Sequence, residues 1–71
     1  MATEVESEIA GSVWMIEKRE GEPLAAAEVI LVIESMKMEI PVEAPCAGTL
    51  AELRVAEGDE VSEGMVLAVI E

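Results

Sequence analysis

The sequence has 71 residues, of which 52% are apolar; its 16 Asp and Glu residues against four Lys and Arg give a formal charge of −12. A chain of this size buries only about 60% of its unfolded surface, which allows one compact core but no additional enclosed catalytic cleft. Because so acidic a surface repels phosphate backbones and anionic headgroups, nucleic acids and membranes are excluded as partners. We predict one domain over residues 1–71 that docks on basic protein surfaces or uses its charge for solubility alone.

Few residues of this chain have reactive side chains. Cys46 is the only cysteine, so no internal disulfide can form and we expect a reducing, cytoplasmic location. The absence of histidine argues against a metal site, a catalytic triad or a base that titrates near neutral pH. The first residues lack the basic and apolar regions of a signal peptide, and the apolar runs are far shorter than the roughly 20 residues that span a bilayer. We expect a non-catalytic protein that is a monomer when isolated.

Apolar, β-branched segments alternate with turn residues along the chain. In residues 4–9, glutamates alternate with Val5, Ser7 and Ile9, which predicts a half-buried strand. Further strands are expected over residues 12–16, 29–33, 40–42, 49–55 and 66–70, with glycine- and proline-containing turns between them. Residues 24–28 could form a helical turn but are too short for a stable helix. Short strands at this spacing predict an all-β sandwich or barrel.

The chain contains an internal repeat with an offset of 37 residues. Residues 11–34 align on residues 48–71 without a gap, with seven identities in 24 positions and matching glycines and apolar positions. Because neither copy could bury its apolar face alone, the repeat predicts interlocked halves related by a pseudo-twofold axis. The first copy continues into residues 35–39 whereas the second stops at Glu71. We therefore expect residues 35–39 to project from the end opposite the C-terminus.

Residues 33–40, Ile-Glu-Ser-Met-Lys-Met-Glu-Ile, form a near-palindrome. A hairpin with a two-residue loop at Met36 and Lys37 would pair three sets of residues across the strands: Ser35 with Met38, Glu34 with Glu39, and Ile33 with Ile40. Such loops prefer Asn-Gly or other glycine-rich pairs, because both central residues need a positive φ. Met-Lys is therefore a poor loop sequence, which is expected where function overrides local stability. The lysine would be presented at the tip of the hairpin.

The segment Glu-Ser-Met-Lys-Met-Glu, residues 34–39, resembles the attachment motif of the biotin/lipoyl attachment domain family, which in biotinyl domains is usually Glu-Ala-Met-Lys-Met. The turns at Gly21, residues 44–48, Gly58-Asp59 and Gly64 also match the family's framework. The resemblance covers the chain from about Ile9 to Glu71, and the length is similar to that of free-standing members. It implies a flattened β-sandwich of two antiparallel sheets with the modified lysine on a tight hairpin.

The resemblance also implies a function. Biotin would be attached covalently to Lys37 by a biotin protein ligase, and the arm would carry carboxyl groups between the biotin carboxylase and carboxyltransferase of a biotin-dependent carboxylase, such as an acyl-CoA carboxylase. The neighbouring residues are assigned to recognition by the ligase or partner: Glu34, Ser35, Met36, Met38 and Glu39. Because a lysine in water is almost entirely protonated at neutral pH, the ligase has to supply an activated acyl donor. Tethering then raises the effective concentration of the cofactor at both active sites.

Two alternatives remain beside the biotin carrier. A lipoyl carrier on the same fold would serve acyl or aminomethyl transfer, although lipoyl domains usually have Asp-Lys-Ala around the lysine. An unmodified acidic docking module would use the hairpin only as a docking peptide. Acetyl-CoA, propionyl-CoA, urea and pyruvate carboxylases all use similar carriers, so the acyl substrate stays open.

Two further residues are interpreted through the repeat. Trp14 aligns with Ala51, and we interpret this only aromatic residue as a packing residue. Ala27 aligns with Gly64 and stands where the family usually has a glycine. If that turn needs a positive φ, the alanine costs conformational energy there.

Overall fold

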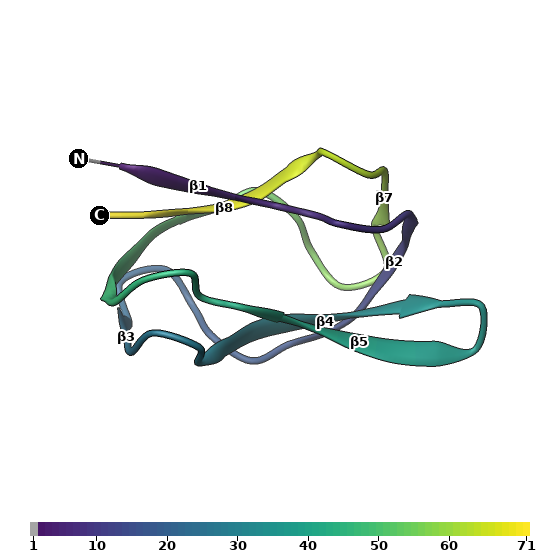
Figure 1. Ribbon diagram of the computed structural model, residues 1–71, viewed down its shortest axis with the longest axis horizontal. Helices are drawn as coiled ribbons and strands as arrows, with labels where there is room; N and C mark the ends of the chain where they lie inside the picture. The colour runs from purple at the N-terminus through teal and green to yellow at the C-terminus, as the bar shows by residue number, and fades with distance from the viewer. Residues whose placement is uncertain (1) are drawn as a thin grey trace.

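A computed structural model describes residues 2–71 of the protein. Its eight strands are β1 (Thr3–Glu6), β2 (Gly11–Ile16), β3 (Pro23–Leu24), β4 (Val29–Ser35), β5 (Met38–Glu43), β6 (Gly48–Leu53), β7 (Glu60–Val61) and β8 (Val66–Ile70). They form two antiparallel sheets, in the orders β1-β8-β6-β3 and β5-β4-β2-β7, which face each other as two layers (Figure 1). This confirms the all-β sandwich. None of residues 2–71 lies in a helix, so no helical segment among them has the length and apolarity to cross a membrane.

The two sheets correspond strand by strand at the 37-residue offset. Strands β2, β3, β4 and β5 match β6, β7, β8 and β1, so the order of one sheet maps onto that of the other. The hydrogen bonds between the halves repeat as well. The Gly21 N–H donates to the Leu50 carbonyl at 2.7 Å, and the Gly58 N–H donates to the Val13 carbonyl at 2.8 Å. The predicted pseudo-twofold is confirmed, and it extends to β1 and β5, which lie outside the aligned copies.

Two matched glycines allow the halves to interlock closely. A Cβ on Gly48 would lie 2.7 Å from both the Glu71 carbonyl oxygen and the Ile70 side chain. A Cβ on Gly11 would meet the equivalent carbonyl and methyl group at the end of β4. Contacts this short are essentially never tolerated, so any side chain at either position would force strands apart. Here glycine is required by space rather than by backbone conformation.

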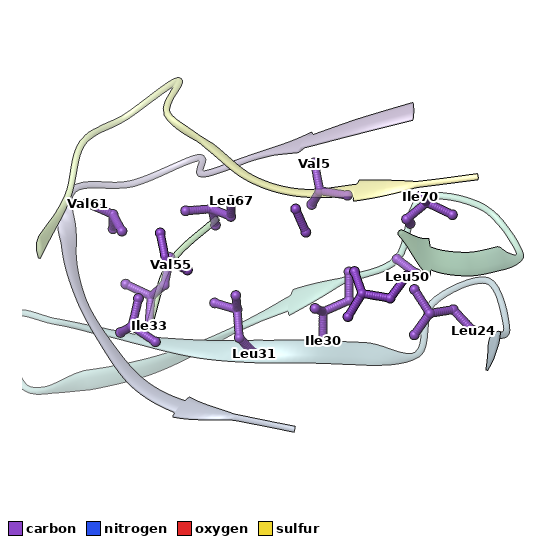
Figure 2. Close-up of a cluster of buried hydrophobic side chains, with 13 residues drawn as sticks. Val5, Leu24, Ile30, Leu31, Ile33, Leu50, Val55, Val61, Leu67 and Ile70 are labelled. Carbon is purple, nitrogen blue, oxygen red and sulfur yellow. The ribbon is translucent and has the colours of Figure 1, made fainter. Parts of the chain in front are cut away.

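The core lies between the two sheets and is entirely aliphatic (Figure 2). Its centre consists of fully buried side chains from both halves: Ile30, Leu31, Ile33, Leu50, Leu67 and Ile70. Burying each side chain of this size contributes roughly 1.5–3 kcal/mol. Strand β4 supplies half of this set, so the strand that leads to residues 35–39 is fixed to the centre of the core.

Several details differ from the sequence expectations. The first strand ends at Glu6, because the buried Ser7 hydroxyl donates to the Ile9 carbonyl at 2.6 Å and turns the chain. Strands β3 and β7 were not expected; Leu24 begins no helical turn but lies in β3. The interpretation of Trp14 as a packing residue is wrong, since its side chain is 45% exposed. Ala27 has a φ of 70°, and its counterpart Gly64 has a φ of 84°, so the turn does need a positive φ.

Candidate functional site

The hairpin between β4 and β5 has the register expected from the palindrome. The cross-strand pairs are Ser35 with Met38, Glu34 with Glu39, and Ile33 with Ile40. The two loop residues both have a positive φ, 54° at Met36 and 66° at Lys37. This conformation belongs to tight hairpin turns and costs a residue with a side chain roughly 1–2 kcal/mol. Two of the three non-glycine residues with positive φ in residues 2–71 therefore lie at this one tip.

The hairpin projects from one end of the molecule. In Figure 1 the β4–β5 turn extends past the rest of the chain at one end, whereas both termini lie at the opposite end. This is the arrangement expected from the repeat. The fully buried Ile33 in β4 anchors the base of the hairpin in the core. The tip is therefore held on a fixed base rather than on a loose loop.

The side chains at the tip are open to solvent. Met36 is 90% exposed and Met38 is 64% exposed, and Lys37 is exposed between them. Within residues 2–71 the ammonium group of Lys37 makes no salt bridge, because the two pairs present there join Lys18 with Glu28 and Arg54 with Glu52. Two exposed methionines gain nothing from packing here. The arrangement leaves a primary amine free to enter another protein's active site.

The carboxylates beside the lysine do not neutralise it. Glu34 and Glu39 pair across the strands and are both exposed. Elsewhere, a hydrogen bond from the backbone N–H of Ala25, together with Lys18, lowers the pKa of Glu28. The same ion pair, 3.0 Å long, raises the pKa of Lys18. Lys18 is thus engaged in a structural contact, whereas Lys37 is not.

Ser35 has a role that the sequence did not indicate. Its hydroxyl donates to the Ala10 carbonyl at 2.8 Å, and this bond joins the base of the hairpin to the segment that precedes β2. We expected Ser35 to be a recognition residue equivalent to the alanine of the usual motif. An alanine could not make this bond, and no local pattern relates Ser35 to Ala10 across 25 residues.

The largest groove lies apart from the hairpin tip. It runs between the edge strands β1 and β5 and has a volume of about 710 Å³. Its only ionisable side chains are carboxylates, from Glu4, Glu6, Glu8 and Glu43. In residues 2–71 no group of three or more His, Cys, Asp or Glu side chains is placed to hold a metal ion. The geometry favours presentation of Lys37 over chemistry performed by the chain itself.

Comparison with known proteins agrees with this geometry. The family model described as biotin-requiring enzyme, of the biotin/lipoyl type, matches residues 1–70. The chain belongs to the biotin/lipoyl attachment family. It is 41% identical over 70 residues to a homologue of the biotinylated protein TB7.3 from Mycobacterium leprae, covering 99% of each chain. It is 38% identical over 63 residues to the biotin/lipoyl attachment protein of Bacillus subtilis, covering 89% of this chain and 86% of that one.

A solved structure extends the comparison to three dimensions. The crystal structure of Kluyveromyces lactis urea carboxylase contains a region that matches the whole chain with a TM-score of 0.95 and 31% identity. The match covers only 6% of that enzyme. The flattened sandwich of two antiparallel sheets is therefore the fold of a carrier region within a biotin-dependent carboxylase.

Proposed function

We propose that this protein is a non-catalytic biotin carboxyl carrier whose Lys37 is biotinylated by a biotin protein ligase. The observation that carries the proposal is the tip of the hairpin, where Lys37 lies exposed in a strained two-residue loop with no ionic partner in residues 2–71. Strain of this kind persists only where the surrounding structure imposes it and is concentrated at functional sites. Neither the core nor any salt bridge requires a lysine there.

The residues of the chain fit an amide-linked arm. Amide formation needs an amine that can enter the ligase's active site, lose a proton there and attack an activated acyl group, and Lys37 offers such an amine without a competing contact. The hairpin base, fixed by Ile33, orients the arm away from the body of the molecule. When attached, biotin supplies a ureido nitrogen that accepts a carboxyl group. Met36, Met38, Glu34 and Glu39 are the exposed groups beside Lys37 that a ligase or partner enzyme would contact.

The proposed cycle places the carrier between two enzymes. The arm would take a carboxyl group at a biotin carboxylase and deliver it at a carboxyltransferase, and a short tether would raise the local concentration of the cofactor at both. The Met-Lys-Met sequence supports biotin over lipoate, as do a relative named for its biotinylation and a carrier region within a urea carboxylase. We propose the cytoplasm as the compartment, in keeping with the free thiol of Cys46.

The test is the intact mass of the chain after incubation with ATP, biotin and a purified biotin protein ligase, with a parallel reaction using lipoate and a lipoate ligase. We expect one biotinyl increment on the wild-type chain and none on Lys37→Arg. Lys18→Arg is the matched control and should be modified like the wild type. A lipoyl increment alone would assign the protein to lipoyl carriers. No increment with ligases that modify their own carriers would contradict the swinging-arm function.

A further inference from the structure

The outer faces of the two sheets differ at one row of side chains. On the sheet that contains β4 and β5, Met15 pairs with Val32, and Val32 pairs with Pro41, so the three lie side by side across the strands. On the other sheet the twofold-equivalent row consists of Glu52, Val69 and Glu4. The same backbone positions are therefore apolar in one half and flanked by carboxylates in the other.

Trp14 enlarges this apolar row. The register between β2 and β4 shifts between Val13 and Met15, which inserts Trp14 beside the row. Trp14 is 45% exposed and Met15 is 37% exposed, whereas Val13 before them is buried. We call Trp14, Met15, Val32 and Pro41 the apolar face.

The fold itself does not require the apolar face. The equivalent shift in β6 lies between Leu50 and Glu52 and contains Ala51 where β2 has Trp14. That half forms the same strands with an alanine and two glutamates at the equivalent positions. Contiguous exposed apolar side chains with polar surroundings mark interaction surfaces more often than chance. The apolar face is thus explained by a partner rather than by packing.

The apolar face lies directly behind the hairpin tip. Strands β4 and β5 contain Val32 and Pro41 and also end at the loop with Lys37. Because side chains alternate along a strand, Glu34 and Glu39 lie on the same outer face, one row closer to the tip. Five residues separate Val32 from Lys37, which corresponds to about 16 Å of strand. A protein surface that holds Lys37 can cover this face in the same contact.

We propose, on the basis of the function proposed above, that the apolar face is the docking surface for the biotin protein ligase that modifies Lys37. The ligase acts on the lysine nitrogen itself, so it must hold the hairpin in direct contact, whereas a carboxylase acts at the far end of the arm. The matching ligase surface has apolar side chains opposite Met15 and Trp14. It has Lys or Arg side chains opposite Glu34 and Glu39, by charge complementarity.

The twofold relation supplies a matched pair of variants. Met15→Glu gives the apolar face the residue that Glu52 already occupies in the other half. Met65→Glu is the control, because Met65 is 38% exposed and its twofold counterpart is Glu28. Both variants add one negative charge at a methionine of nearly equal exposure, and both insert a residue that the same fold accepts elsewhere. Only the first variant alters the proposed docking surface.

The experiment is steady-state biotinylation by a purified biotin protein ligase with ATP and biotin, with the carrier chain as the varied substrate. Met15→Glu should raise KM about tenfold or more, as expected for a charge placed within an apolar contact, and leave kcat unchanged. Met65→Glu should stay within about twofold of the wild type. Met15→Gln, which adds no charge, should give an intermediate KM. Thermal unfolding of each variant shows that the samples are folded.

The outcomes separate this proposal from the one on which it rests. If the wild-type chain is not biotinylated, the proposed function fails. If the wild type is modified and Met15→Glu has the same KM, or if Met65→Glu is impaired equally, the docking surface is contradicted while the carrier function stands. Light scattering at the assay concentration tests the other occupant. A wild-type dimer that Met15→Glu dissociates would assign the apolar face to a second copy and contradict ligase docking.

Discussion

The two ends of the sandwich are built on one frame and differ in what joins the strands. At one end β4 and β5 pair Ile33 with Ile40 and continue for six residues into the hairpin that presents Lys37. At the twofold-equivalent end β8 and β1 pair Ile70 with Thr3, and that pair is followed closely by the termini. The frame therefore needs no hairpin at this position, since one of its two ends forms without one.

This difference separates stability from function along the chain. The buried residues and the matched glycines occur in both halves and hold the halves together. The exposed lysine with its methionines occurs in one half only and adds strain rather than buried area. Substitutions in the frame should therefore act equally in the two halves, whereas substitutions in the hairpin should act on one end alone.

The largest effect is expected in the frame. Gly11→Ala and Gly48→Ala should each lower the free energy of unfolding by about 1–3 kcal/mol, since the added Cβ would collide with backbone at the end of β4 or β8. Urea unfolding measures both variants. Thr49→Ala, at an exposed neighbouring position of β6, is the control and should change stability much less. Tolerance of alanine at one glycine and not at the other would break the symmetry on which the comparison depends.

A smaller effect of opposite sign is expected at the tip. Replacing Met36 and Lys37 together by Asn-Gly, the pair preferred in such loops, should raise the free energy of unfolding by about 1–2 kcal/mol. In a chain of this size this corresponds to a higher melting temperature by roughly 4–8 °C per kcal/mol. The same variant removes the proposed attachment site and should not be biotinylated.

Ala27→Gly provides the control for the loop variant. Ala27 also has a positive φ but lies away from the tip, so glycine there should stabilise the chain without affecting modification of Lys37. If Asn-Gly at the tip leaves stability unchanged while Ala27→Gly raises it, the tip is not strained. The strain would then no longer support a functional role for the loop.

The frame and the hairpin could be predicted from the sequence because each has a pattern. The repeat at 37 residues gave the twofold, and the palindrome over residues 33–40 gave the register of the hairpin to the residue. The strands β3 and β7 could not be found, because two-residue strands have no periodicity. Strand β3 exists because Pro23 and Leu24 pair with Thr49 and Gly48 of the other half.

Two side-chain environments also could not be predicted, for a related reason. Trp14 lies outside the core because the register shift places it after the buried Val13, and no composition or period indicates a shift. The bond from Ser35 to the Ala10 carbonyl depends on how the hairpin sits against a distant turn. Residue pattern determines which strands pair, whereas such contacts depend on the assembled halves.

The smallest expected effect concerns this bond. Ser35→Ala should lower the free energy of unfolding by no more than about 0.5–1.5 kcal/mol, toward the lower value because the site is partly open to solvent. Its clearer signature is local: amide hydrogen exchange should become faster in β4 and β5 near the tip, while the β1–β8 pair at the other end keeps its protection. Ser35→Thr retains a hydroxyl and should restore slow exchange. Equal loss of protection at both ends, or no difference between alanine and threonine, would show that the hairpin base is held by β4 and the core alone.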